Sequence, residues 1–349
     1  MNNQEQNSRN MEKSTRSSCG RRNEPYGYAF NALSKIWLAL AVGFLLFPGL
    51  ARAQQYVFEN IAFPGDTFTQ LLGINDSDTI AGYHGQFVNS GFTLTLGAPN
   101  IFTSENFPNS ISTQVFGITN AGDTAGFYVD NSDVNHGFLN TNGVFSTVDF
   151  PGTTFDQILG LNNKGQAAGY FMTGNQQTAF IFNPFLPVGG QFTPLSLPGS
   201  GQATGINDLG QVSGFFATGT NTDDGFLLSA GKLTILSFPG ATVTEASGLN
   251  NLGQVVGFYN DAAGNPHGFI YSHGVYTSLD DPGATQTTVN GINNFGQIVG
   301  FALEPNGNTV GFVGAPLVVS EPSLLGLLAL GSTALVGMCI LRSRRSSFR

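Results

Sequence analysis

Residues 54–319 contain no arginine, no cysteine and no tryptophan. Without cysteine, no disulfide can form inside this segment, but its 266 residues are enough to bury a core without one. Without arginine, the segment lacks the forked side chain that binds carboxylates and phosphates through two parallel hydrogen bonds. The lack of tryptophan also weakens an interpretation as an aromatic platform for sugars.

Basic residues are almost absent from the same segment. Lys164 and Lys232 stand against eighteen Asp and Glu, which gives a formal charge of −16. The whole-chain value of −9 hides this imbalance, because the other eleven basic residues lie near the two ends. A segment this acidic repels a phosphate backbone, so the sequence predicts no nucleic-acid partner.

The amino-terminal residues 1–53 have the features of a secretory signal peptide with a long basic region. The uncharged apolar run 36–50 follows Arg21, Arg22 and Lys35. Small residues, Ala51 and Ala53, then occupy the −3 and −1 positions of a cleavage site after Ala53. A start at Met11 and a slowly cleaved signal anchor are the alternatives left open.

The carboxyl-terminal tail, residues 316–349, predicts membrane targeting. Its segment 324–341 is eighteen residues without a charge, long enough to cross a bilayer as a helix. A cluster of arginines follows, which favours a cytoplasmic position for this end.

The order of parts in this tail resembles the PEP-CTERM sorting signal of Gram-negative bacteria, in which Pro-Glu-Pro precedes a transmembrane helix and a basic end. Here Glu321 and Pro322 match the motif, and Ser320 replaces its first proline. The resemblance covers about 30 residues. It implies an exosortase-type processing enzyme as a partner, transient anchoring in the inner membrane, and a final location at the cell surface or outside the cell.

Between the two ends, a ten-residue sequence motif of the form G-[IL]-N-N-x-G-Q-x-x-G, here called the repeated phrase, recurs six times with variations. Its copies occupy 73–82, 117–126, 160–169, 205–214, 248–257 and 291–300, with first glycines 43 to 45 residues apart. A fixed period of this length marks a repeat architecture, and it equals the length of a four-stranded propeller blade. Within each unit, short β-branched and aromatic segments are separated by Gly, Asn, Pro and Asp, and no segment has helical periodicity.

We therefore predict an all-β fold over residues 54–315: a six-bladed β-propeller of four-stranded blades. A parallel β-helix ranks second, because its coils are normally shorter. The strand at 56–65 precedes the first repeat, while the last repeat lacks an equivalent strand after 311–313. The amino-terminal strand is therefore expected to complete the last blade and close the ring.

The repeated phrase also predicts a tight hairpin with a left-handed glycine. The glycines expected there are Gly122, Gly165, Gly210, Gly253 and Gly296, while the first copy has Ser77 or Asp78 at this point and a looser hairpin.

The phrase, followed about ten residues later by His-Gly-Phe at 136–138 and 267–269, resembles the HAF family of bacterial extracellular repeats. The resemblance covers roughly residues 56–315. It implies an exported repeat protein, and the family has no established enzymatic activity to carry over.

Most residues that stand out have a structural interpretation. The repeat asparagines are expected to bond nearby backbone in turns. The GFY segments are the glycine that ends the repeated phrase and the aromatic residues after it, and the GF segments are those at Phe92, Phe138, Phe180, Phe226, Phe269 and Phe312. The aromatic residues of both are expected to fill the core between blades. The asparagines are Asn75, Asn120, Asn162, Asn207, Asn250 and Asn293. His84, His136, His267 and His273 are interpreted as turn and packing residues, since no HExxH, CxxC or GxSxG motif is present.

The loops ahead of the GF segments vary most, and variable loops on a rigid scaffold are where ligands bind. We place the candidate ligand site at Asp130, Asp133, Asp223, Asp224, Asp261 and His267. No metal site or cofactor is predicted, although clustered oxygen ligands leave Ca²⁺ open.

The function predicted from these features is a non-enzymatic binding or structural role in the cell envelope or extracellular matrix, with a glycan or protein ligand. The alternative is an extracellular polysaccharide hydrolase or lyase that uses a carboxylate pair, with Asp149, Asp280 and Asp281 as candidates.

Overall fold

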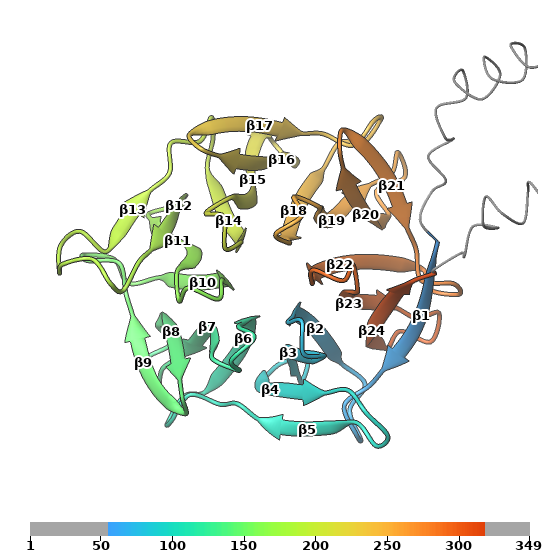
Figure 1. Ribbon diagram of the computed structural model, residues 1–349, viewed down its shortest axis with the longest axis horizontal. Coiled ribbons are helices and arrows are strands. Elements are labelled where there is room, and N and C mark those ends of the chain that lie inside the picture. The colour runs from blue at the N-terminus through green and yellow to red at the C-terminus, as the bar shows by residue number, and fades with distance from the viewer. Residues whose placement is uncertain (1–54, 318–349) are drawn as a thin grey trace, which may run out of the picture. The chain divides into compact units, whose positions relative to one another are not determined.

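Six antiparallel four-stranded sheets form a ring in the computed structural model, which describes residues 55–317 (Figure 1). Each sheet is one blade, and its innermost strand is the one that runs into the repeated phrase. The described residues contain strands and turns and no helix. The predicted fold class, an all-β six-bladed propeller, is confirmed.

The strands follow the repeats in order. Blades one to three comprise β2 (Thr69–Ile74), β3 (Thr79–His84), β4 (Ser90–Thr95), β5 (Ile101–Ser104); β6 (Ser112–Ile118), β7 (Thr124–Val129), β8 (Asn135–Thr141), β9 (Val144–Val148); β10 (Asp156–Leu161), β11 (Ala167–Thr173), β12 (Gln176–Phe182) and β13 (Phe192–Pro194). Blades four to six comprise β14 (Gly201–Ile206), β15 (Val212–Gly219), β16 (Thr222–Ser229), β17 (Lys232–Leu236); β18 (Thr244–Leu249), β19 (Val255–Asn260), β20 (Pro266–Ser272), β21 (Val275–Leu279); β22 (Gln286–Ile292), β23 (Ile298–Leu303), β24 (Thr309–Pro316) and β1 (Tyr56–Ile61).

The amino-terminal strand closes the ring, as predicted. β1 pairs antiparallel with β24, in a register that runs from Tyr56 opposite Pro316 to Ile61 opposite Gly311. Figure 1 shows this blue strand on the outer edge of the orange-red sixth blade. The last blade therefore has the same four strands as the others, although one of them comes from the other end of the chain.

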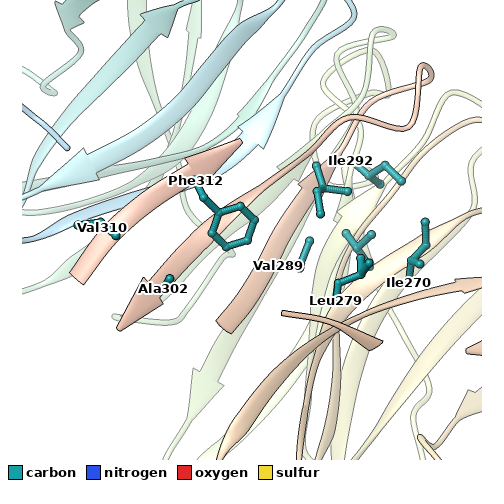
Figure 2. Packing of buried hydrophobic residues seen from close by; sticks show 9 residues of the cluster. Ile270, Leu279, Val289, Ile292, Ala302, Val310 and Phe312 are labelled. Carbon is teal, nitrogen blue, oxygen red and sulfur yellow. The ribbon is translucent and has the colours of Figure 1, made fainter. Parts of the chain in front are cut away.

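The core lies between neighbouring blades. The phenylalanine of each GF segment is 0 or 1% exposed, which confirms the interpretation of these residues as core. Figure 2 shows one such cluster, in which Phe312 and Val289 of the sixth blade lie with Ile270 and Leu279 of the fifth. Packing of this kind joins each blade to the next.

The hairpins between the first and second strands have the predicted left-handed turns. The φ angles of Gly122, Gly165, Gly210, Gly253 and Gly296 lie between 72° and 92°. In the first copy Asp78 takes this position with φ of 56°.

Several expectations fall on residues outside 55–317. These are the signal peptide at 1–53 with Ala51 and Ala53, the Ser320-Glu321-Pro322 motif, and the apolar segment 324–341. Among the residues that the structure describes, no helix is long and apolar enough to cross a membrane.

Candidate functional site

A cavity of about 500 Å³ lies on the ring axis and is lined by residues from all six blades. Each innermost strand has a β-bulge just ahead of the first glycine of the repeated phrase, for example between Ala246 and Gly248. Bulges redirect a side chain locally. The six bulge residues all line the cavity: Leu72, Phe116, Leu159, Thr204, Ser247 and Asn290.

These bulge residues give the cavity two different walls. Leu72, Phe116 and Leu159, from blades one to three, are apolar, and Leu159 belongs to a buried cluster with Phe127 and Tyr170. Thr204, Ser247 and Asn290, from blades four to six, carry hydroxyl and amide groups. One side of the cavity therefore offers hydrogen bonds and the other offers apolar contact.

Nearer the start of each inner strand, a polar residue lies opposite an aromatic one. Gln202 pairs with Phe215, Glu245 with Phe258, and Thr288 with Phe301. All six of these residues line the cavity, and the three phenylalanines are partly exposed. The polar wall thus also presents aromatic rings, and these rings correct in part the expectation that the GFY aromatics fill the core.

Glu245 is the only carboxylate among the residues that line this cavity. Burial, and then the charge of Asp223, raise the pKa of Glu245 to about 7. Asp223 lies close because its strand forms a bridge with Val243, two residues before Glu245. Burial and Asp224 in turn raise the pKa of Asp223.

At the other end of the axis, two rings of hydrogen bonds surround a smaller hollow of about 70 Å³. In the first ring, buried asparagine amides donate to the backbone carbonyl of the next blade at 2.9 to 3.1 Å. Its members are Asn75, Thr119, Asn162, Asn207, Asn250 and Asn293. Within each turn, the Oδ1 atoms of the five asparagines also accept from the backbone N–H groups two and four residues further on, so the predicted turn-bonding role is confirmed for five of the six repeat asparagines.

Asn120 belongs instead to the second ring, because Thr119 takes the aligned position in the second repeat. In this ring each backbone N–H donates to the side-chain oxygen of the next member, at 2.7 to 2.9 Å. Its members are Asp76, Asn120, Asn163, Asp208, Asn251 and Asn294, and the ring is complete.

The two aspartates of the second ring stand three blades apart, and each accepts two asparagine amides. Asp76 accepts from Asn120 and Asn294 at 3.0 and 2.8 Å. Asp208 accepts from Asn163 and Asn251 at 2.9 and 2.8 Å. Partial burial opposes ionisation of Asp208, but these hydrogen bonds outweigh it and lower its pKa.

The six residues predicted as a ligand site lie in three blades. Asp130 and Asp133 are in the turn between β7 and β8 of the second blade, and Asp261 is in the corresponding turn of the fifth. His267 lies in β20, also in the fifth blade. Asp223 and Asp224 lie in β16 of the fourth blade and not in a loop.

Of these six, the structure brings Asp261 and His267 into contact. His267 contacts Asp280 through Nδ1 at 2.9 Å and Asp261 through Nε2 at 3.4 Å. Burial opposes protonation of His267, but the two carboxylates outweigh it and raise its pKa. Backbone and side-chain hydrogen bonds from Asn265, with help from His267, lower the pKa of Asp261 to about 2.

A matching arrangement occurs in the second blade. There His136 lies 3.0 Å from Asp149 and 3.6 Å from Asp130. Both histidines stack on a tyrosine of the neighbouring strand, Tyr128 or Tyr259. These contacts fasten a turn to a strand, in agreement with the interpretation of these histidines as turn and packing residues.

The hydrolase hypothesis requires a pair of carboxylates that face each other, but the three candidate carboxylates do not lie together in one central cleft. Asp149 lies between blades two and three, whereas Asp280 and Asp281 lie between blades five and six. None of the three lines the axial cavity. Within residues 55–317, no group of three His, Cys, Asp or Glu is arranged to hold a metal ion.

No family model and no curated protein sequence matches the chain. Among solved structures, TolB from Acinetobacter baumannii is similar at 12% identity and a TM-score of 0.44, over 84% of this chain and 71% of TolB. The Aleuria aurantia lectin in complex with Fucα1-6GlcNAc is similar at 10% identity and 0.45, over 73% and 97% of the two chains. The SapL1 lectin in complex with alpha methyl fucoside is similar at 10% identity and a TM-score of 0.45, over 73% of this chain and 98% of the lectin. Similarity at this level assigns no ligand or activity to the chain.

Sequence reasoning missed the axial cavity and Glu245. A signal was present in the aligned repeats, since the residue three positions before the first glycine of the repeated phrase is glutamine in blades one to four and Glu245 in the fifth. A single charged residue in a column of neutral polar residues marks a position where the blades are not equivalent.

Proposed function

We propose that this protein is an exported, non-enzymatic saccharide-binding propeller, and that the axial cavity holds the sugar. The observation that carries the proposal is the composition of the cavity wall in blades four to six. There Phe215, Phe258 and Phe301 lie beside the hydroxyl and amide groups of Thr204, Ser247 and Asn290. A sugar ring has apolar C–H faces and polar hydroxyl edges, and such a wall complements both.

The cavity volume of about 500 Å³ is in the range of small-ligand sites. The export part of the proposal rests on the sequence: the apolar run 36–50 with its alanine cleavage site, the tail at 316–349, and the HAF-like repeats. We propose accordingly that an exosortase-type enzyme processes the chain, and that the processed protein acts at the surface of a Gram-negative cell or outside the cell. An envelope or matrix glycan is the partner proposed.

A glycan array probed with the purified 54–319 fragment tests the binding function, followed by calorimetry on the strongest ligands. Phe258→Ala should weaken binding about tenfold or more, because one aromatic platform of the cavity is lost. Phe295→Ala is the matched control, since Phe295 is 68% exposed in the hairpin at the opposite end of the axis. Equal binding by both variants and the wild type, with the fold intact, would place the site elsewhere.

One observation favours the alternative of a polysaccharide hydrolase or lyase. Glu245 has a pKa of about 7, the range that a general acid needs, and Asp223 lies near it. Release of new sugar ends by the wild type, abolished by Glu245→Gln while binding persists, would establish catalysis over simple binding.

A further inference from the structure

We propose that the axial cavity selects sugars that carry a free amine, and that the carboxylate of Glu245 receives the ammonium group. This inference rests on the proposed function, because it names the class of saccharide that the same cavity binds. An amino sugar supplies a ring with C–H faces and hydroxyl edges, together with one positive charge.

The first argument is that Glu245 lacks a partner. No hydrogen bond to its carboxylate is formed within residues 55–317, and burial and Asp223 are the influences on its ionisation. The two lysines of this part of the chain lie elsewhere: Lys164 is in the hairpin beside Asp208, and Lys232 is an exposed residue at the start of β17. A partly buried carboxylate without a partner is costly, so a cationic ligand gains what the protein itself does not supply.

The second argument is the position of aromatic rings around this carboxylate. Phe258 is directly opposite Glu245 in the strand register, and Phe215 and Phe301 occupy the equivalent places in the two neighbouring blades. A cation within reach of an aromatic face is attracted by its quadrupole, most strongly where water is excluded. Glu245 and Phe258 therefore act on the same ammonium group.

The third argument is selectivity. Acetylation of the amine would remove the positive charge and leave a single amide N–H to meet the carboxylate of Glu245, which would then be buried without a counter-ion. A site that must bury a polar group without its partner discriminates strongly against the ligand lacking that partner. A neutral N-acetyl sugar is therefore expected to bind more weakly than its free-amine counterpart.

The charges that face Glu245 set the pH dependence. From β16, Asp223 faces it, with Asp224 beside Asp223, and both are acidic. The neighbouring strands β14, β15 and β22 carry no titratable residue, and Tyr259 of β19 stacks on Phe238 at 3.6 Å. Since Asp223 raises the pKa of Glu245 to about 7 together with burial, a bound ammonium should lower it and release protons. The sugar amine itself loses its proton close to neutral pH, so affinity should be highest near pH 7, where the ammonium and the carboxylate coexist, and lower at pH 6 and at pH 8.

The experiment is titration calorimetry of the 54–319 fragment with the β-1,4-linked glucosamine tetrasaccharide and with its fully N-acetylated form. Each titration is run at pH 6, pH 7 and pH 8 in two buffers of different ionisation enthalpy. The free-amine form should bind about tenfold or more tightly at pH 7, with proton release at pH 6, where Glu245 starts protonated, and proton uptake at pH 8, where the sugar amine starts neutral.

Glu245→Gln should abolish this preference and the proton release. It should fold normally, because glutamine occupies the same position in blades one to four. Glu59→Gln changes the net charge equally at an exposed site on β1 and should behave as the wild type.

Equal affinity for the two tetrasaccharides, or an unchanged preference in Glu245→Gln, would overturn the inference while leaving saccharide binding in place. Failure of both sugars to bind, together with an empty glycan array, would overturn the proposed function as well. Binding of the amine form with release of shorter sugars would instead identify the site as catalytic.

Discussion

At the scale of single residues, Asp76 and Asp208 accept a backbone hydrogen bond as the asparagines of the second ring do, and they also accept two side-chain amides each. Both oxygens of the Asp208 carboxylate are in use, one by the backbone N–H of Asn163 at 2.8 Å and the other by two amides. Asparagine has one acceptor oxygen, so it cannot accept all three bonds equally well. Each acid therefore lies between two amides, and this order matches donors to acceptors around the mouth of the axis.

We predict that Asp208→Asn lowers the free energy of unfolding at pH 7 by about 1–2 kcal/mol, because hydrogen bonds to a charged acceptor are replaced by weaker ones. The folded state lowers the pKa of Asp208, so its contribution is present at neutral pH and is lost as the pH falls below about 4. Urea denaturation at several pH values measures both effects.

The wild type and Asp208→Asn should therefore converge in acid. Asp133→Asn is the control, since Asp133 is exposed in a left-handed turn that asparagine also adopts. A difference between wild type and Asp208→Asn that stays constant down to pH 3 would contradict the assigned role of the carboxylate.

At the scale of the strand and blade, the sixth blade departs from the others at one packing position. Blades one, two, three and five stack two aromatic rings there, such as Phe238 on Tyr259, and the fourth packs Leu197 there. The sixth blade instead has Asp281, with Ala302 at the position of the second ring. Asp281 is 6% exposed, and its Oδ2 has no hydrogen-bond partner. Burial raises the pKa of Asp281, although a hydrogen bond with Asn60 opposes the shift.

Asp281→Leu should stabilise the protein by about 1–2 kcal/mol at pH 7, because an unsatisfied buried carboxylate is removed. Leucine already stands at this position in the fourth blade, as Leu197. The raised pKa means that the carboxylate destabilises the fold increasingly as the pH rises above about 4. The stability gained by Asp281→Leu should accordingly be small in acid and full at neutral pH. In the wild type, ionisation of Asp281 therefore destabilises the fold, whereas ionisation of Asp208 stabilises it.

Thermal unfolding at pH 4 and pH 7 checks this prediction. Leu197→Asp is the reciprocal variant and should be destabilised at pH 7. A lower melting temperature for Asp281→Leu at pH 7 would show that the carboxylate has a structural partner.

The repeat period and the missing last strand were sufficient to predict six blades and their closure, because both follow from counting segments along the chain. The cavity was beyond the same reasoning. Phe258 and Tyr259 are adjacent aromatics that face opposite ways, Phe258 onto the axis and Tyr259 onto Phe238. Alternation predicts that they differ, but which of them faces the axis depends on how the ring curves. Glu245 escaped notice for the same reason, since its surroundings come from β16 and from the neighbouring blades.

At the scale of the whole molecule, stability depends on a strand that is far from its partner in sequence. Besides its pairing with β24, β1 packs Phe58 edge-on against Phe312 at 5.2 Å, and Tyr56 donates a hydrogen bond to the carbonyl of Gly296 at 3.0 Å. These contacts join the first strand to the core of the last blade.

Deleting residues 54–65 should lower the melting temperature and promote aggregation, because β24 would become an unpaired edge. The fragment that starts at residue 54 is the control, since it keeps β1. Light scattering and calorimetry compare the two. A shortened chain that remains monomeric with an unchanged melting temperature would show that β1 is dispensable for the ring.

The same closure decides how the propeller can be held. The backbone N–H of Leu317 donates to the carbonyl of Gln55 at 2.7 Å, so the described chain enters and leaves at one point on the circumference of the sixth blade. An attachment at residue 55 or at residue 317 therefore holds the propeller at its edge and not through either face. Because residues 55 and 317 lie side by side, immobilisation of the propeller through either residue should present the same two faces to a ligand in solution.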